Sequence, residues 1–277
     1  MSLGKIATNI DAQQAYNSLT KVNKSLATTQ LRMSTGKRIN STEDDPAGYQ
    51  LARTLERRNR GLETALSNVS NAKNILAIAE GGFQSIMDIL QTVKEKATQA
   101  ADLSLSSTQR DSINDQVTAL VAEIDDIVNE TTFNGSNLID GNYAGNFQTG
   151  ENADNVLGVA LENADSAALS VEVGSGADID FSSAATANAS ITVVDAAIDT
   201  LAGNIQDIGE FQTRLTVKEN TLSVSITNTD AVRSNVEDAD MVREQMELLK
   251  LQIIQQTASV SFTQANTNPQ LVLQLMQ

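Results

Sequence analysis

Apolar residues recur at alternating spacings of three and four through residues 51–100 of this sequence, and this spacing is the seam of a coiled coil. The seam positions, with one charged interruption at Arg58, are Leu51, Leu55, Leu62, Ala65, Val69, Ala72, Leu76, Ala79, Phe83, Ile86, Leu90, Val93, Ala97 and Ala100. One helix of this extent would be about 75 Å long at 1.5 Å per residue. Asp45 suits its N-cap and Pro46 its first position. The pattern predicts a rod and not a globule.

Two further stripes have the same spacing, at residues 113–127 and 194–226, so three long helices could pack side by side. The spacing at Thr108 and Asp111 predicts that a capping box opens the second helix. Aromatic residues make up 3% of the chain and there are two prolines. Few aromatic residues favour an elongated core, and few prolines permit uninterrupted helices.

Residues 131–189 differ in character, because glycine and asparagine interrupt them repeatedly. Short apolar alternations occur at 156–161 and 169–173. Such alternation between turn residues predicts short strands, and therefore a β-hairpin region between the helices.

Both ends of the chain are amphipathic but lack an obvious partner within it. The N-terminal stripe has heptad spacing, and the C-terminal segment carries apolar residues around much of its girth. No charged residue follows Lys250, whereas residues 111–213 contain no lysine or arginine and many carboxylates. Because a charge is costly to desolvate, the uncharged tail suits the interior of an assembly and the acidic middle suits its surface.

Several classes of function are disfavoured by composition. The net charge of −16 argues against nucleic acid as a partner. The chain has no histidine and no cysteine, so histidine acid–base catalysis, thiol nucleophiles and zinc sites built on these residues are absent. The adjacent carboxylates Asp44 with Asp45, and Asp125 with Asp126, are better explained as a cap and a helix surface. We expect no enzyme activity, no cofactor and no metal.

No apolar run is long enough to span a membrane, so we expect no membrane insertion. The first twenty residues carry Leu3, Ile6 and Ile10 between polar positions, which is unlike a cleavable signal peptide. If the protein is secreted, we expect a route without a cleaved leader.

Motifs at both ends resemble those of bacterial flagellins. The N-terminal signature is matched by residues 31–41 (LRMSTGKRINS) and 44–48 (DDPAG), and the loop that closes the N-terminal helical region by 132–135 (TFNG). The C-terminal signature is matched by 236–240 (VEDAD), 252–256 (QIIQQ), 264–266 (QAN) and 269–275 (PQLVLQL). The resemblance covers about residues 1–140 and 190–277.

This resemblance implies a mainly α fold: a long coiled-coil-like helical rod formed by both halves of the chain, with a small β-hairpin region. The terminal helices form an inner assembly domain, expected at residues 1–45 with 235–277, including a connecting segment at 34–45. The rod domain is expected at 46–140 with 190–234, and a short hairpin or variable surface segment at 141–189. The chain looks like a minimal flagellin, with little or no outer-domain insertion.

The implied function is that of a structural subunit of the bacterial flagellar filament, which self-assembles into a hollow helical extracellular filament for swimming. The implied partners are other copies of the chain, the flagellar export apparatus and a flagellin chaperone, the filament cap, and the hook-associated junction proteins. Two alternatives stay open: a hook–filament junction protein, and a soluble coiled-coil binding module with no flagellar role.

We expect apolar residues of both ends to form the interface between subunits. They are Ile6, Ile10, Leu19, Val22, Leu26, Met33, Met246, Leu249, Ile253, Ile254, Val260, Phe262, Leu271 and Leu275.

The resemblance also aligns one stretch with the segment of flagellins that a Toll-like receptor of innate immunity binds. The aligned residues are Gln91, Thr92, Val93, Lys94, Glu95 and Lys96, with Gln116 from the facing helix. Thr92 stands at the usual arginine, Lys96 at the usual leucine, and Gln116 at a glutamate. Since the bidentate donor set is lost and a charge replaces an apolar contact, we predict weak or absent activation of the receptor.

Overall fold

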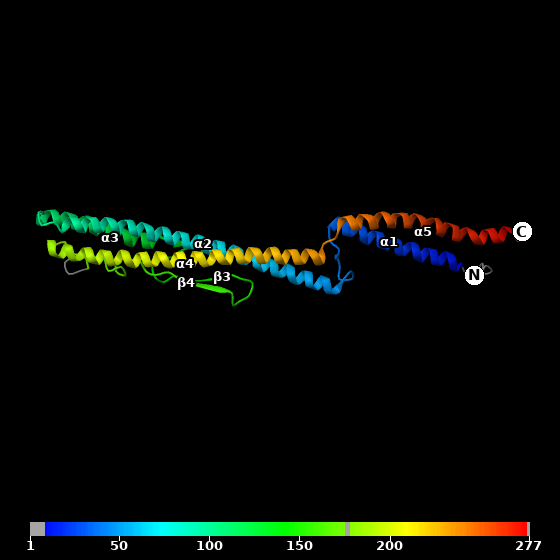
Figure 1. Cartoon of the computed structure of the whole chain (residues 1–277), viewed down its shortest axis with the longest axis horizontal. Coiled ribbons are helices and arrows are strands. Elements are labelled where there is room, and N and C mark those ends of the chain that lie inside the picture. The colour runs from blue at the N-terminus through cyan, green and yellow to red at the C-terminus, as the bar shows by residue number, and fades with distance from the viewer. Residues whose placement is uncertain (1–8, 175–177, 276–277) are drawn as a thin grey trace. The chain divides into compact units, whose positions relative to one another are not determined.

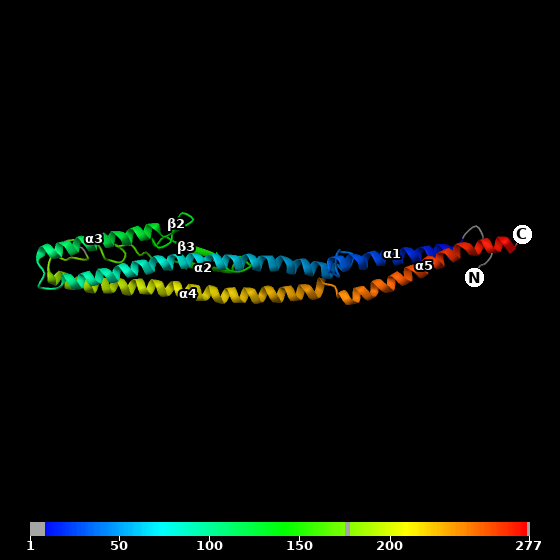
Figure 2. The ribbon, with the colours of Figure 1, turned by 90° about the horizontal axis from the view of Figure 1, so that it is seen from above.

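The computed structural model describes residues 9–174 and 178–275, with side chains described as far as residue 267. Five helices make up most of it: α1 (Ile10–Thr35), α2 (Pro46–Ala100), α3 (Ser107–Glu130), α4 (Ala184–Glu237) and α5 (Met241–Leu275). The strands are short: β1 (Thr132–Phe133), β2 (Ser136–Asn137), β3 (Ala144–Gln148) and β4 (Val156–Ala160). The expected mainly α fold with long helices and a small hairpin region is confirmed (Figures 1 and 2).

The chain divides into two compact units. The terminal unit comprises Met1–Asn59 and Thr227–Gln277, and the middle unit comprises Arg60–Ile226. Helices α2 and α4 each contribute residues to both units, whereas α1 and α5 lie wholly in the terminal unit and α3 in the middle unit.

The core of the middle unit is the heptad seam of α2, closed by α3 and α4. From Leu62 to Ala100 every predicted seam position is buried, most of them completely. These side chains form one cluster with buried residues of α3 such as Val117 and Ile124 and of α4 such as Leu201 and Leu215. At about 1.5–3 kcal/mol for each large apolar side chain buried, this continuous seam is the main stabilising feature of the unit.

At its N-terminal end the predicted seam was wrong, because it is displaced by one residue. Ala52 and Asn59 are buried there, whereas Leu51 is exposed and Arg58 lies at the surface. The spacing of three and four continues through Asn59 and Ala52. The helix buries the neutral amide of Asn59 in preference to the charged guanidinium of Arg58, because a charge costs more to desolvate.

Polar contacts join α2 to α4 alongside the seam. Lys73 Nζ lies 2.7 Å from Glu219 Oε2, Gln212 donates to Glu80 Oε2 at 2.8 Å, and Lys94 Nζ lies 2.5 Å from Asp195 Oδ1. As the α2 residue numbers rise the α4 numbers fall, so the two helices are antiparallel. Contacts beside an apolar seam are typical of coiled coils and favour one register.

A capping box opens α3, but it lies two residues before the predicted one. Ser106 Oγ accepts from the Gln109 backbone N–H, and Gln109 Oε1 accepts from the Ser106 backbone N–H at 2.9 Å. The longer Gln109 side chain reaches back to the cap, which explains why this pair and not Thr108 with Asp111 forms the box.

Two antiparallel strand pairs follow α3. The pair β1–β2 is closed by Asn134 and Gly135, both with positive φ, and the pair β3–β4 runs in register from Ala144↔Ala160 to Gln148↔Val156. The alternation at 156–161 was therefore a strand, with Leu157 and Val159 facing the core.

The predicted strand at 169–173 does not form. Ser170 has a φ of 55°, which is incompatible with an extended strand, although Leu169 and Val171 on either side of it are buried. The apolar alternation there arises from a loop that turns two side chains inward. The partner of β4 is β3 instead, which lacks the β-branched residues that usually indicate a strand.

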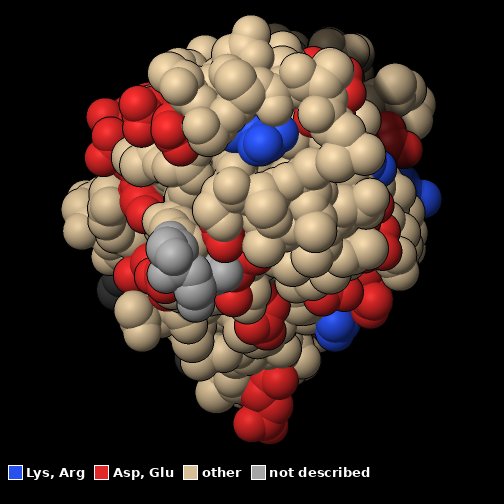
Figure 3. Space-filling view, turned by 90° about the vertical axis from the view of Figure 1, so that its left-hand side faces the viewer, with Lys and Arg blue, Asp and Glu red and all other residues tan. Residues whose placement is uncertain are grey.

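Charge is uneven at the end of the middle unit where α2 turns into α3. Figure 3 views that end, and acidic atoms cover more of it than basic atoms. The sequence explains this, since α3, the hairpin region and the first half of α4 contain no lysine or arginine after Arg110.

Candidate functional site

In the terminal unit α1 and α5 pair with each other, side by side and antiparallel (Figures 1 and 2). Asn9 caps α1 by accepting from the Ala12 backbone N–H, and Gly36, with a φ of 72°, ends it. The cross-helix contacts are Asn9 Nδ2 to Ala265 O (2.9 Å), the Tyr16 and Phe262 rings (6.0 Å between centroids), Gln255 Nε2 to Asn23 Oδ1 (2.8 Å), and Arg32 to Glu244 (3.7 Å).

The α1 side of this pair is a full heptad seam. Its buried or half-buried positions are Ala12, Ala15, Leu19, Val22, Leu26, Thr29 and Met33. The facing positions of α5 are Glu244, Leu248, Leu251, Gln255, Ala258, Phe262 and Ala265. Most of these α1 side chains are apolar, so each terminal helix has a partner within the chain. The amphipathic patterns alone did not identify this partner, although the family resemblance placed both ends in one domain.

A second stripe on α5 has no cover in the part of the chain that the structure describes. Val242, Met246, Leu249, Ile253 and Val260 are 61–70% exposed, and the first four have seam spacing. Exposed apolar residues occurring singly are normal, but a contiguous stripe on one helix indicates an interaction surface. We call these five residues the α5 outer stripe.

The fourteen predicted interface residues therefore fall into three groups. Exposed side chains are Ile10, Met246, Leu249, Ile253, Ile254 and Val260. Half-buried side chains, on the faces where α1 and α5 meet, are Leu19, Val22, Leu26, Met33 and Phe262. Ile6 and the side chains of Leu271 and Leu275 lie outside the described residues. Val242 is exposed on the same face of α5 but is not among the fourteen predicted residues, although its spacing to Met246 places it in their stripe.

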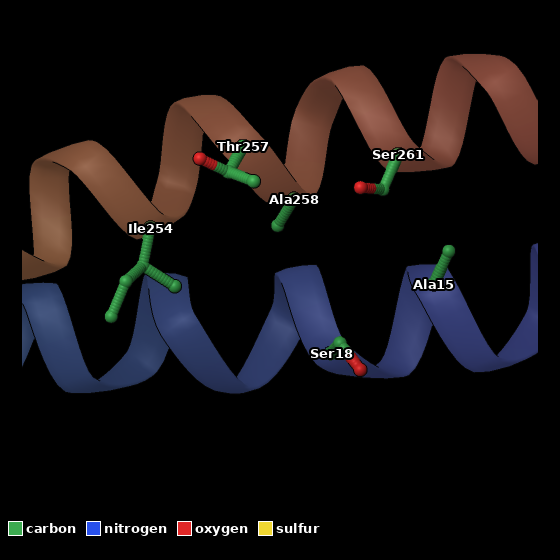
Figure 4. Close-up of a pocket in the computed structure, with 6 residues that line it drawn as sticks. All are labelled: Ala15, Ser18, Ile254, Thr257, Ala258 and Ser261. Atoms are coloured by element: carbon green, nitrogen blue, oxygen red, sulfur yellow. The ribbon is translucent and has the colours of Figure 1, made fainter.

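A groove of about 350 Å³ opens between α1 and α5 near the middle of the pair (Figure 4). Its lining residues are Ala15, Ser18, Ile254, Thr257, Ala258 and Ser261. Ile254 points from α5 toward α1, and the Thr257 hydroxyl donates to the Ile253 carbonyl 3.0 Å away. The groove exists because small side chains face one another here.

A cluster of ionic contacts lies at the end of the α1–α5 pair where the chain passes from α1 to α2 and from α4 to α5. Glu237 Oε1 lies 2.7 Å from Lys37 Nζ and 3.0 Å from Arg53 Nη2. The glutamate side chain is only 4% exposed, whereas its two cations are each about two-fifths exposed. The Arg53 guanidinium also lies 5.0 Å from the centre of the Tyr49 ring. Sequence reasoning missed this cluster, because its members have no periodicity.

The segment that follows α1 is held by Asp44. Asp44 Oδ2 accepts from the backbone N–H groups of Ser41 (2.9 Å) and Asn40 (3.0 Å). These two hydrogen bonds, with a smaller contribution from Arg32, lower the pKa of Asp44 below its ordinary value. The next carboxylate, Asp45, accepts from the Gly48 N–H and caps α2 at Pro46, as predicted.

The stretch aligned with the innate-receptor site is only partly available at the surface. Val93 is completely buried in the core of the middle unit, and Lys94 is paired with Asp195. Gln91 and Glu95 are exposed on α2, Thr92 and Lys96 are half-buried, and Gln116 is exposed on α3.

Other kinds of site were sought in the described residues. Within 9–174 and 178–275, no three or more acidic side chains are placed to hold a metal ion. Of the helices described, none combines the length and apolarity needed to cross a membrane.

Two families match this sequence: the bacterial flagellin N-terminal helical region over residues 6–144 and the bacterial flagellin C-terminal helical region over residues 191–276. A flagellin of Bacillus subtilis strain 168 is 33% identical, covering 98% of this chain and 99% of its own length. Flagellin FlaB1 of Treponema pallidum strain Nichols is 30% identical, covering 97% and 98%.

One solved structure is similar to this chain in fold only. It is of a putative flagellar hook-associated protein from Vibrio parahaemolyticus, with a TM-score of 0.60 and 17% sequence identity, covering 70% of this chain and all of that one. The sequence relatives, in contrast, match almost from end to end and through both helical regions. The chain belongs to the bacterial flagellin family.

Proposed function

We propose that this chain is a structural subunit of the bacterial flagellar filament, and that its terminal unit drives self-assembly with other copies. The observation that carries the proposal is the α5 outer stripe, five exposed apolar residues on one helix whose opposite face already packs on α1. Full burial of each side chain would contribute about 1.5–3 kcal/mol. In a polymer, contact between neighbouring subunits would bury the outer stripe of every subunit.

The charge distribution supports the same arrangement. Residues 251–277 have no charged side chain, so burying their side chains in a filament desolvates no side-chain charge. The middle unit carries the acidic surface, which is compatible with exposure to water. We propose that residues 1–45 with 235–277 form the inner assembly domain, 46–140 with 190–234 the rod domain, and 141–189 a surface segment.

The partners and location follow from family membership as proposals. We expect an extracellular filament whose subunits pass through the flagellar export apparatus with a flagellin chaperone and without a cleaved leader. The filament cap and the hook-associated junction proteins would contact its two ends. The proposed role is mechanical and not catalytic.

The hook–filament junction alternative is less favoured. The hook-associated structure resembles this chain in fold only, whereas relatives named as flagellins match its sequence over nearly its whole length. A binding module without a flagellar role is disfavoured by the same relatives.

Seeded polymerisation tests the proposed function. Purified chain with short filament seeds should elongate into filaments visible by negative-stain microscopy. Met246→Ser with Ile253→Ser should stop elongation, because polar side chains would replace two members of the outer stripe. Val217→Ser is the matched control, since Val217 is also exposed, on α4 in the middle unit, and its loss should leave elongation unchanged. Elongation of the double variant at the normal rate would contradict the proposal.

We further propose that innate-receptor recognition is weak. The buried Val93 and the paired Lys94 reduce the surface on offer, and Thr92, Lys96 and Gln116 depart from the family pattern. Receptor signalling at nanomolar concentrations of purified monomer would contradict this.

A further inference from the structure

The exposed methionines among the described residues both lie near the start of α5. The chain has six methionines, four of them within residues 9–174 and 178–275. Met33 and Met87 are half-buried, and Met87 packs against the core of the middle unit. Met241 and Met246 are 42% and 62% exposed. Because solvent reaches their sulfur atoms directly, these two thioethers are the ones most open to oxidation.

The two exposed methionines differ in their surroundings. Met246 belongs to the α5 outer stripe, with Val242 one turn before it and Leu249 one turn after it. Met241 is five residues earlier, about 140° around the helix, and lies outside the stripe. Burial of the outer stripe against a second copy of the chain would therefore desolvate Met246. Met241 is a comparison of the same chemistry on the same helix.

Oxidation converts the Met246 side chain from an apolar group into a polar one. Hydrogen peroxide transfers one oxygen atom to the sulfur: its O–O bond breaks, an S–O bond forms and water is released. The sulfur loses two electrons and the peroxide gains them. The product, methionine sulfoxide, carries an oxygen that accepts hydrogen bonds, and methionine sulfoxide reductases reverse the change with a dithiol as the reductant.

A sulfoxide at Met246 would lack an available donor once the outer stripe is buried. The neighbouring members of the stripe are apolar. Lys250, one turn later, already pairs with Glu247, with Nζ 3.1 Å from Oε2. Arg243 lies one turn earlier, but donating to a buried oxygen would desolvate its own charge. Since an acceptor buried without a donor is unfavourable, an oxidised copy should bind its neighbour more weakly.

We propose that Met246 is a reversible oxidation site, and that its sulfoxide hinders a subunit from joining the filament. This inference rests on the proposed function, because burial between copies is what makes the new oxygen unfavourable. Burial also covers the sulfur, so oxidation acts on the free chain and an assembled subunit resists it. Pairing of α1 with α5 in the free chain is not required, since that pairing leaves Met246 exposed.

Partition of a partly oxidised population tests the proposal one methionine at a time. Brief treatment with hydrogen peroxide oxidises a fraction of the unsubstituted chains, and seeded elongation then separates them into filaments and supernatant. Trypsin cleaves after Arg243 and Lys250, so Met241 and Met246 fall on separate peptides and mass spectrometry measures each sulfoxide independently. Met246 sulfoxide should be depleted from filaments roughly tenfold, as for a polar group buried without a partner. Met241 sulfoxide should be equally abundant in both fractions.

Reversal and substitution give two further measurements. Incubation of the supernatant with the two methionine sulfoxide reductases, one for each epimer, and dithiothreitol should return its chains to filaments. Met246→Gln places an uncharged polar group in the stripe without an oxidant and should slow elongation roughly tenfold. Met241→Gln is the matched control and should leave the elongation rate unchanged.

Two outcomes overturn the proposal. One is an equal abundance of Met246 sulfoxide in filaments and supernatant. The other is elongation of Met246→Gln at the rate of Met241→Gln, since a polar group would then be tolerated in the stripe. Failure of the unoxidised chain to elongate is a different result: it would overturn the proposed function, and with it the burial on which this inference depends.

Discussion

Gly82 of α2 lies against Thr131, the C-cap residue that follows α3. A Cβ placed on Gly82 would be 2.8 Å from Thr131 Oγ1, 3.0 Å from its Cγ2, and 3.1 Å from Ile139 Cδ1. The preceding residue, Gly81, is exposed and has no atom within 4 Å of such a Cβ. Of two adjacent glycines in one helix, only the second is required by packing.

Alanine at these two positions should therefore have opposite effects. Gly81→Ala should stabilise the middle unit by about 0.5–1 kcal/mol, because alanine has the higher helix propensity. Gly82→Ala should destabilise it by about 1–3 kcal/mol, since the new methyl group overpacks the contact with Thr131 and Ile139. Urea unfolding followed by circular dichroism measures both. Equal effects of the two variants would show that the close approach at Gly82 is unimportant.

The seam of α2 should dominate the stability of the middle unit. Phe83 is 1% exposed and lies among the largest buried side chains, whereas Ile78, on the same helix, is 41% exposed. Phe83→Ala should cost about 3–5 kcal/mol through lost burial and a cavity. Ile78→Ala should cost much less, because its side chain already contacts water. A shift of the urea midpoint for Ile78→Ala as large as that for Phe83→Ala would contradict the assignment of the seam.

The segment after α1 should loosen in acid because of Asp44. The backbone hydrogen bonds from Ser41 and Asn40 lower its pKa in the folded state, so ionised Asp44 favours the folded segment above its ordinary pKa of about 4. That contribution is lost as the pH falls through the lowered pKa of the folded state. Amide exchange at Ser41, followed by NMR, should show protection at pH 5–7 that disappears on acidification below about pH 4.

Asp44→Asn separates this effect from general acid denaturation. The asparagine at position 44 cannot ionise, so the Ser41 amide of this variant should exchange faster at neutral pH. Its protection factor should then change little as the pH falls through the range in which Asp44 titrates. If the variant and the unsubstituted chain lose Ser41 protection in parallel as the pH falls, the carboxylate of Asp44 is not responsible.

The sequence predicted those features that repeat. Heptad spacing located α2, α3 and α4 and the seam from Leu62 to Ala100, because a coiled-coil core imposes its period on the sequence. Before Leu62 the predicted seam is displaced by one residue at two positions, Leu51 in place of Ala52 and Arg58 in place of Asn59. The displacement arose where the apolar pattern is interrupted, so that the period alone had to define the register. The strand wrongly predicted at 169–173 shows the complementary weakness, since a loop can bury alternate residues without being extended.

Non-periodic contacts between distant residues could not be predicted. Lys37 and Glu237 are separated by 200 residues, and nothing in either local sequence indicates the other. Likewise, the apolar ends indicated that faces must be buried but not that α1 would cover only one face of α5. What distinguishes Leu251, buried on α1, from Ile253, exposed two residues later, is the rotation of α5, which depends on the whole terminal unit.

Two adjacent carboxylates on α3, Asp125 and Asp126, differ in their contacts and allow a matched comparison of variants. Asp125 accepts from both the backbone N–H and the hydroxyl of Ser166, each at 2.8 Å, and so anchors the loop before α4 to the helix. Asp126 is the next residue and points to solvent. Alanine raises helix propensity at both positions equally, so the difference between the two variants isolates the contact with Ser166.

Asp125→Ala should destabilise the middle unit by about 1.5–3 kcal/mol, the range for hydrogen bonds to a charged group, because the Ser166 N–H and hydroxyl lose their acceptor in a buried setting. Asp126→Ala should lie within about 0.5 kcal/mol of the unsubstituted chain. Asp125→Asn should fall between them, since an amide oxygen can still accept one bond but carries no charge. Hydrogen exchange at Ser166 reads the contact itself, and it should accelerate in Asp125→Ala but not in Asp126→Ala. Acceleration in both variants would mean that the loop is held by the helix as a whole, and unchanged exchange in both would mean that Asp125 does not anchor it.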